Sequence, residues 1–239
     1  MTKKNGQPAK YMGGNFGNVK SFLSFVAPKA IGIVIMEIQE RIRQKADELF
    51  RRYGIRSVTM DEIATQLGMS KKTIYQYYTD KDQLVDAVAI DEIHYSQECC
   101  TKDAADSANA IEEIFRVMEF VEIMFRNMNP SMLHDLEKYH PAGFKKFLEH
   151  KNKFLYEMIK KNIERGIKEE LYRPEIDIEI MTRYRLESLM LGFNTELFPS
   201  SKFNLAKLQQ EIIEHFLYGL ATLKGYKLIL KYKQQRINK

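Results

Sequence analysis

The stretch at 59–84, TMDEIATQLGMSKKTIYQYYTDKDQL, decides the fold that this sequence predicts. Thr59 and Glu62 have the spacing of a capping box, and the apolar residues after them repeat at helical intervals. Gly68 stands where that helix must end, because glycine accepts the left-handed conformation of a helix C-terminus. Ser70 can begin a second helix. Helix, glycine turn and helix in this order predict a helix-turn-helix.

The second helix, KKTIYQYY at 71–78, has two chemically different faces. Ile74 and Tyr78 point to one side, and the lysine, threonine and glutamine side chains point to the other. Those polar side chains suit the base edges of a DNA major groove. A pair of solvated surface helices is the alternative interpretation. The candidate base-contacting residues are Lys71, Lys72, Thr73, Gln76 and Tyr77.

Polar side chains at helix starts are the candidate phosphate contacts. A helix start offers backbone N–H groups to an anion, and a nearby hydroxyl or ammonium adds a donor. Asp80 with Gln83 begins a third helix, which places Lys81 at such a start. The candidates are Thr59, Ser70, Tyr75 and Lys81.

A set of residues in and before this stretch carries a family resemblance: Ala46, Phe50, Gly54, Thr59, Ile63, Ala64, Gly68, Ser70, Thr73, Ile74, Tyr75, Tyr78, Lys81 and Leu84. Together they resemble the N-terminal domain of the tetracycline-repressor (TetR-like) family of bacterial regulators, over roughly Glu37 to Val88. The resemblance implies that the recognition helix lies in the major groove and that Tyr75, Lys81 and Thr59 hold the DNA backbone.

Two positions depart from the pattern of that family. Lys72 stands where glycine or another small residue is frequent, and Tyr78 stands where phenylalanine is frequent. The first difference bears on base preference or on a phosphate contact. The second requires a partner for a buried hydroxyl.

Composition limits the class of protein. Of 239 residues 44% are hydrophobic, which is enough for a core, and the cysteines are an adjacent pair, Cys99 and Cys100. Without a disulfide framework we expect a cytoplasmic protein, and we regard a redox role for the pair as the minor alternative. The lysines before Met36 are five in number and the net charge is +5, so the rest of the chain is formally neutral. The case for DNA binding therefore rests on local placement of charge.

We expect an all-α chain: an N-terminal three-helix helix-turn-helix domain followed by a larger helical ligand-binding and dimerisation domain. The predicted parts are a flexible N-terminal extension at 1–36, the helix-turn-helix domain at 37–83, the helical domain at 84–224 and a basic tail at 225–239. For the extension, a signal peptide, an upstream start artefact and an arm that reaches a minor groove are alternatives, and its broken apolar run is too short to span a membrane.

Periodicity predicts further helices at 37–53, 80–98, 107–129, 130–140, 141–165, 178–198 and 205–223, with Gly166 ending the fifth of these. Methionine and phenylalanine make adaptable apolar walls for a ligand, with ordinary core positions as the alternative. The candidate pocket residues are Met118, Val121, Phe125, Phe147, Phe154 and Met158, with Glu122 and Tyr184 as polar anchors.

The resemblance also implies a homodimer formed by the last two long helices. Gly192 and Gly219 would let a helix of the partner approach closely. The candidate interface residues are Leu189, Gly192, Phe193, Ile212, Phe216, Gly219 and Leu220.

These features predict a homodimeric, ligand-responsive transcriptional regulator, a repressor that binds a palindromic operator in double-stranded DNA. Its effector is a small molecule that the sequence does not identify, and the helix at 80–98 is the lever between the two domains. We expect no cofactor, and no metal, because His134 and His140 would lie on different faces of a helix. An architectural, ligand-independent DNA-binding protein is the alternative. An all-helical enzyme is disfavoured because the chain has no phosphate loop or nucleophile elbow.

Overall fold

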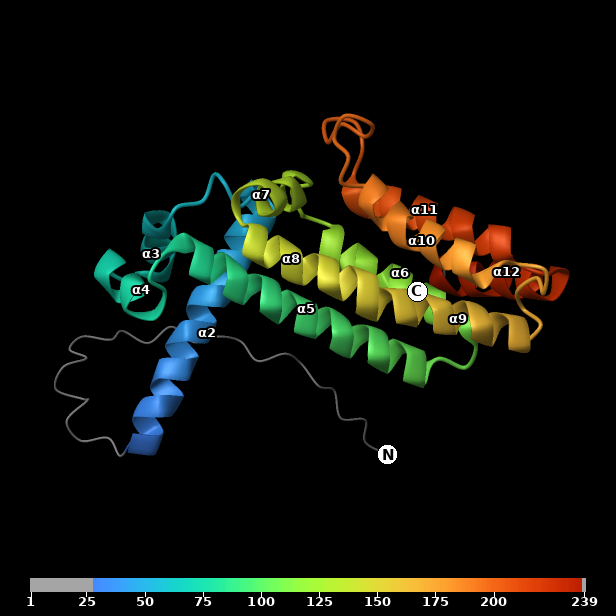
Figure 1. The fold of residues 1–239 in the computed structure, drawn as a ribbon, viewed down its shortest axis with the longest axis horizontal. Coiled ribbons are helices and arrows are strands. Elements are labelled where there is room, and N and C mark those ends of the chain that lie inside the picture. The colour runs from blue at the N-terminus through green and yellow to red at the C-terminus, as the bar shows by residue number, and fades with distance from the viewer. Residues whose placement is uncertain (1–27, 238–239) are drawn as a thin grey trace. The chain divides into compact units, whose positions relative to one another are not determined.

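The computed structural model describes residues 28–237, whose helices are joined by turns and loops, with one isolated bridge between Tyr172 and Ala221. The helices are α2 (Pro28–Tyr53), α3 (Met60–Leu67), α4 (Lys71–Tyr77), α5 (Lys81–Asp106), α6 (Ala110–Phe125), α7 (Ser131–Tyr139), α8 (Pro141–Glu149), the π-helical turn η1 (His150–Leu155), α9 (Tyr156–Lys168), α10 (Ile178–Leu191), α11 (Leu205–Leu220) and α12 (Leu223–Ile237) (Figure 1). The chain divides into two compact units, Met1–Arg41 and Ile42–Lys239, and α3 to α12 belong to the second. No described helix is both long and apolar enough to cross a lipid bilayer.

The helix starts and the turn predicted around the helix-turn-helix are confirmed. Each start has a side-chain oxygen that accepts a hydrogen bond from the backbone N–H three residues later: Thr59 from Glu62 at 3.1 Å, Ser70 from Thr73 at 3.1 Å and Asp80 from Gln83 at 2.8 Å. Gly68 has φ of 64°, the left-handed value that ends α3. These contacts fix where α4 begins and therefore which of its residues face outward.

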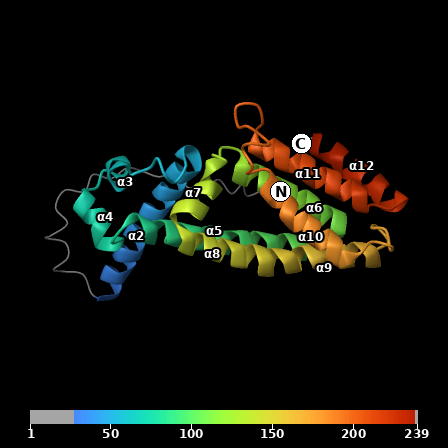
Figure 2. The same cartoon turned by 45° about the horizontal axis from the view of Figure 1, so that its top comes forward.

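Helices α5 and α6 pack against one another and against several of the later helices (Figures 1 and 2). Helix α5 contacts α6 and α8, and α6 contacts α9, α11 and α12. The main buried cluster of the second group of helices lies between α6, α9, α11 and α12 and comprises Ala110, Ile111, Phe115, Ile163, Leu171, Tyr172, Phe216, Leu217, Leu220 and Ile229. Helix α5 thus begins in the helix-turn-helix and continues into the second group of helices without a break.

Several predicted boundaries differ from the structure. Helix α2 begins at Pro28 rather than near Glu37, while the rest of the predicted extension lies outside the described residues. Helix α10 ends at Leu191 rather than Phe198, because the Asn194 side chain accepts hydrogen bonds from the backbone of the following turn. The predicted basic tail is mostly the helix α12, since Ile229 is fully buried in the main cluster.

The prediction that Gly166 ends the preceding helix is wrong. Helix α9 continues to Lys168, and the chain reverses at Glu170, which has φ of 59°. Gly166 instead makes room for Tyr172, whose ring would lie 2.0 Å from a Cβ at this position. The Tyr172 hydroxyl lies 3.1 Å from the Asn162 side-chain oxygen, so the ring and its polar end are both accommodated.

We expect Gly166→Ala to destabilise the protein by about 2 kcal/mol or more, because the new methyl group overlaps the fully buried Tyr172 ring. The matched control is Gly219→Ala in α11, where a Cβ would meet nothing within 4 Å. Within one subunit, alanine there should leave stability unchanged or raise it by up to about 1 kcal/mol. Urea unfolding midpoints measure both changes. Equal midpoints for the two variants would contradict the packing of Tyr172 against Gly166.

Candidate functional site

The outer face of α4 is exposed and its inner face is buried. Ile74 is completely buried and Tyr78, directly after the helix, is nearly so. Of the predicted base-contacting residues, Lys71, Lys72 and Gln76 are exposed, while Thr73 and Tyr77 are half-buried. The buried apolar side of the helix therefore fixes its orientation, and its amide and ammonium donors face solvent.

Two contacts hold side chains of α4 and of the residue after it in place. The Tyr78 hydroxyl lies 3.3 Å from Nη1 of Arg43, which donates to it, so this buried tyrosine has a polar partner. Lys71 forms an ion pair of 2.8 Å with Asp61 of α3, and the hydrogen bond to Asp61 raises the pKa of the Lys71 ammonium. Lys72 stands exposed beside it.

The predicted phosphate contacts occupy different environments. Tyr75 is exposed on α4, and the hydroxyls of Thr59 and Ser70 cap α3 and α4 from exposed positions. Lys81 differs from the prediction: its ammonium points into the turn before α3 and donates to the carbonyls of Ile55 and Val58, each at 2.5 Å. Burial lowers the pKa of Lys81. In this structure Lys81 stabilises the turn that positions α3 rather than projecting outward.

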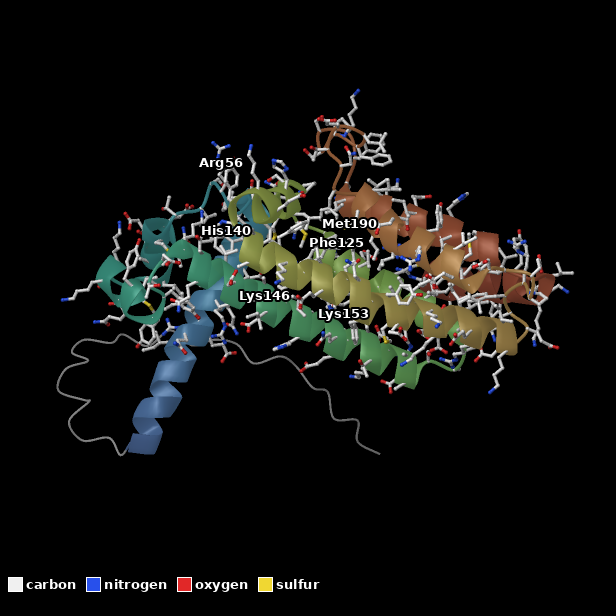
Figure 3. The ribbon with its side chains drawn as sticks, in the orientation of Figure 1. Arg56, Phe125, His140, Lys146, Lys153 and Met190 are labelled. Carbon is white, nitrogen blue, oxygen red and sulfur yellow. The ribbon has the colours of Figure 1, made fainter. Side chains whose placement is uncertain are left out.

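A polar junction links the end of α2 with α5, α7 and α8 (Figure 3). Oδ2 of Asp135 accepts from the backbone N–H of Arg56 at 2.9 Å. On the other side of the junction, Lys146 forms a 2.9 Å ion pair with Asp86 of α5. His140, also labelled in Figure 3, lies with Nδ1 2.7 Å from Asp82 of α5. The turn after α2 and the first part of α5 are thereby held by the same pair of helices.

Arg51, near the end of α2, joins three helices. Its guanidinium bonds Asp47 at 2.8 Å, pairs with Glu92 of α5 and donates to the backbone carbonyl of Met124 in α6 at 2.9 Å. Burial, together with the nearby charge of Glu92, raises the pKa of Asp47 to about 6. The Arg51 carbonyl in turn accepts from the Asn129 N–H at 2.6 Å. Arg51 thus connects α2 directly with α5 and α6.

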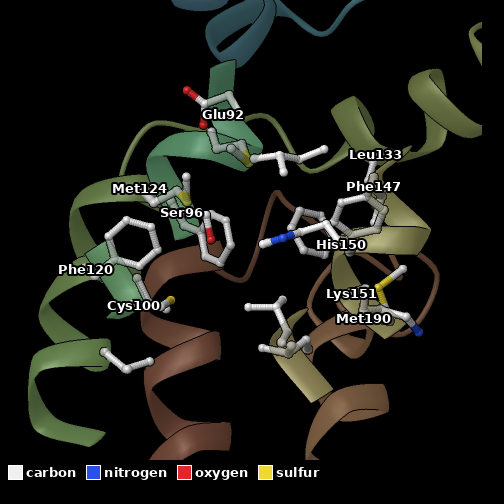
Figure 4. Close-up of a pocket in the computed structure, with 18 of the residues that line it drawn as sticks. Glu92, Ser96, Cys100, Phe120, Met124, Leu133, Phe147, His150, Lys151 and Met190 are labelled. Carbon is white, nitrogen blue, oxygen red and sulfur yellow. The ribbon is translucent and has the colours of Figure 1, made fainter. Parts of the chain in front are cut away.

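A cavity of about 270 Å³ lies among α5, α6, α8, η1, α9 and α10 (Figure 4). Its walls are mostly apolar, and they extend to Phe50 and Ile55 next to the helix-turn-helix. Four of the eight predicted pocket residues line it: Val121, Phe125, Phe147 and Met158. The other four do not. Met118 is buried elsewhere, Phe154 stacks on His150, Glu122 bonds Gln210 and Arg126, and half of Tyr184 is exposed.

Sequence reasoning missed the polar residues of the cavity. His150, Lys151 and Arg185 line it, together with Glu92 and Glu113. The imidazole of His150 projects into the space in Figure 4. A π-helical turn brings His150 and Lys151 there, and such turns recur at functional sites but leave no clear periodicity in a sequence. Helical periodicity could have indicated that Arg185 faces inward, because it lies on the same face of α10 as Thr182 and Leu186, which are buried.

The cysteines and histidines form no metal site in the described part of the chain, where no cluster of three ligand-type side chains occurs. Cys100 lines the cavity, and burial raises the pKa of its thiol to about 11. At neutral pH this thiol is protonated and correspondingly unreactive.

The predicted dimer residues need correction where they are buried within one subunit. Phe216 and Leu220 belong to the main cluster, and a Cβ on Gly192 would lie 2.4 Å from the Gln209 side chain of the same chain. A different apolar stripe is exposed on α10. It consists of Ile180, Tyr184 and Leu191, which are 58%, 50% and 42% exposed.

The buried His150 should make stability depend on pH. Desolvation lowers its pKa from 6.5 to about 4, so the folded state resists protonation that the unfolded chain accepts. The stability this provides is present above pH 6.5 and is lost as pH falls towards 4. We expect the loss attributable to His150 to be about 2 kcal/mol after allowance for solvent screening.

Urea unfolding at pH 7 and pH 4.5 tests this. The loss of unfolding free energy between the two pH values is measured for the natural protein and for His150→Gln, and the difference is the contribution of His150. His134→Gln is the control, since His134 is exposed on α7. A pH dependence unaltered by His150→Gln but reduced by His134→Gln would refute the assignment.

Comparison with known sequences agrees with this geometry. Residues 42–88 match the family model described as bacterial regulatory proteins, tetR family. The chain is 31% identical over 105 residues to YvaF of Bacillus subtilis, described as an uncharacterized HTH-type transcriptional regulator; the match covers 43% of this chain and only 54% of YvaF. An HTH-type transcriptional regulator of Staphylococcus aureus is 24% identical over 165 residues, which cover 68% of this chain and 81% of that protein.

Solved structures share the fold across both groups of helices. A transcriptional regulator from Cytophaga hutchinsonii superposes with a TM-score of 0.60 at 24% identity, covering 77% of this chain and 98% of its own. A TetR-family transcriptional regulator from Streptomyces coelicolor gives 0.59 at 16% identity, covering 78% and 97%. Residues 42–88 therefore carry the helix-turn-helix that the tetR family model describes, and about three quarters of the chain shares the fold of these solved transcriptional regulators.

Proposed function

We propose that this protein is a ligand-responsive repressor that binds a palindromic operator as a homodimer. The observation that carries the proposal is the outer face of α4, which offers Lys72 and Gln76 to solvent while Ile74 anchors the helix from behind. A glutamine amide can bond both polar groups of an adenine edge, and a lysine can bond guanine. One such helix covers only a few base pairs, so two related half-sites are needed for specificity.

Support for the homodimer comes from the exposed stripe on α10. Ile180, Tyr184 and Leu191 recur at intervals that place them along one side of the helix. Gly219 of α11 has open space beside it, which would admit a partner helix. In a two-fold dimer each subunit would supply the same surface of α10 and α11.

Support for a ligand response comes from the position of the cavity. Its lining includes Phe50 and Arg51 of α2 and Glu92 of α5, so an occupant touches residues on the helices that carry the DNA-binding domain. A ligand that prefers an arrangement of α5 unsuited to DNA must weaken DNA affinity by the same factor by which DNA weakens ligand binding. A related structure from Saccharomonospora viridis, with a TM-score of 0.64 at 16% identity, was solved in complex with choline.

Selection of binding sequences from random DNA by the purified protein tests the proposal, with genome-wide mapping of the bound sites. We expect an inverted repeat and few genomic sites. A weakly specific pattern of many sites would instead favour the architectural alternative, in which the cavity has no regulatory role.

Two variants on α4 should lose DNA affinity in different ways. Gln76→Ala should relax preference at one base pair by roughly 1 to 3 kcal/mol, because it removes donors and acceptors that face base edges. Tyr75→Phe should weaken every sequence alike, by roughly 1 kcal/mol, if its exposed hydroxyl contacts phosphate. Titrations against the selected operator and its single-base variants measure both. Gln235→Ala, exposed on α12, is the control. If the two α4 variants showed the same pattern of affinities across the single-base variants, the assignment of Gln76 to a base and Tyr75 to a phosphate would be wrong.

A charge on the α10 stripe should break the dimer. Ile180→Glu would bury an unpaired carboxylate at the proposed interface, which costs several kcal/mol. Ile123→Glu on α6 is the matched control, because Ile123 is even more exposed, at 71%, but lies outside the stripe. Sedimentation analysis should find monomers for the first variant and dimers for the second. Dimers in both would place the interface elsewhere.

A further inference from the structure

Arg185 of α10 is a buried cation that lines the cavity. Its exposed fraction is 4%, and its Nη1 donates to the Ser188 hydroxyl at 3.1 Å. The guanidinium also lies over the Phe216 ring, 5.9 Å from its centre. Among the residues that the structure describes, no carboxylate lies within ion-pair distance of it. Burial lowers the pKa of Arg185 to about 10, so the group keeps its charge at neutral pH.

The other full charges of the cavity lining have partners of opposite sign. Glu113 pairs with Arg165 at 3.2 Å. Lys151 pairs with Glu187 at 2.7 Å. Glu92 pairs with Arg51, which also lines the cavity and bonds Asp47. The wall therefore carries one unmatched positive charge.

An unmatched buried charge is costly, and protein interiors rarely keep one without a partner. A hydroxyl and an aromatic ring offset only part of the desolvation of a guanidinium. An anion in the cavity would supply the missing partner, and a carboxylate fits the planar fork of arginine with two parallel hydrogen bonds. A cationic ligand would be repelled at the same place.

His150 adds a neutral polar group to the same cavity. Its low pKa keeps the imidazole uncharged at neutral pH. Nδ1 lies 3.5 Å from the Gln97 side-chain nitrogen, which favours the tautomer with the proton on Nε2. That N–H is a donor suited to an acceptor on a ligand, and the ring projects into the cavity (Figure 4).

Apolar side chains make up the rest of the wall, including Val121, Met124, Phe125, Phe147, Met158 and Met190. The volume of about 270 Å³ exceeds the roughly 150 Å³ that suffices for benzene. By that comparison the space suits a ligand of roughly ten non-hydrogen atoms.

We propose that the cavity binds a carboxylate with an apolar hydrocarbon tail of medium length, its carboxylate paired with Arg185 and its tail against the methionine and phenylalanine wall. This assignment of ligand class rests on the proposed ligand response and adds the chemistry of the effector to it. Arg185 is then the residue that selects an anionic head group.

Titration calorimetry of the full chain with decanoate, 1-decanol and decylamine tests the ligand class without any substitution. The three molecules share a tail and differ in the charge of the head group. We expect decanoate to bind at least tenfold more tightly than decanol, and decylamine to bind least tightly. Equal affinities, or no binding of decanoate, would overturn the assignment.

Arg185→Gln tests the residue, and Arg183→Gln is its matched control on the same helix, where Arg183 is exposed and pairs with Glu179 at 2.6 Å. Arg185→Gln should lose at least tenfold in decanoate affinity while its decanol affinity is kept or improved, and Arg183→Gln should behave like the natural protein. Without ligand, Arg185→Gln should melt at the same or a higher temperature, since it removes an unpaired charge. A lower melting temperature with unchanged decanoate affinity would make Arg185 a purely structural residue and overturn the proposal.

DNA binding separates this inference from the proposed function. If decanoate binds through Arg185 but leaves operator affinity unchanged, the inferred ligand class is supported and the proposed regulatory response is contradicted. If the protein binds its operator normally but does not bind decanoate, the proposed regulator function is supported and this ligand class is contradicted.

Discussion

The contacts of the Arg51 guanidinium hold the DNA-binding helices to the rest of the chain. One planar group bonds carboxylates on α2 and α5 and a carbonyl on α6, and its partner Asp47 has a raised pKa because the site is poorly solvated. In such surroundings a charged pair tolerates little misalignment, since a separated charge is costly to bury. The three helices therefore have few alternative arrangements, and the proposed ligand response requires an occupant of the cavity beside them to favour one of these arrangements.

The helix-turn-helix could be predicted because its determinants are local. Thr59, Ser70 and Asp80 each bond a backbone N–H three residues away, and Gly68 has the left-handed conformation expected of it. Such contacts depend on neighbouring residues alone, so a sequence pattern is enough to locate them. Helical periodicity also predicted correctly that Ile74 and Tyr78 face inward, because it too depends only on nearby residues.

The cavity was predictable only in part, because its lining depends on how distant helices turn towards one another. Phe125 and Phe147 were identified by residue type, but the anchor chosen on α10 was Tyr184, one residue from the buried Arg185. A shift of one residue rotates a helical position by about 100°, which separates a solvent-facing side chain from a cavity wall. Gly166 was misjudged for a related reason, since its partner, the ring of Tyr172, is fixed by tertiary packing. The contact of Lys81 with the carbonyl of Ile55 was likewise not predictable from neighbouring residues.

The π-helical turn between α8 and α9 also bears on how relatives should be aligned. Such a turn accommodates one residue more than an α-helix of the same length would. A homologue without it would need a single-residue gap within 150–155, and placing the gap elsewhere would put every position of α9 out of register. The equivalents of His150 and Met158 can therefore be compared across the family only after the geometry of this one turn is known in each member.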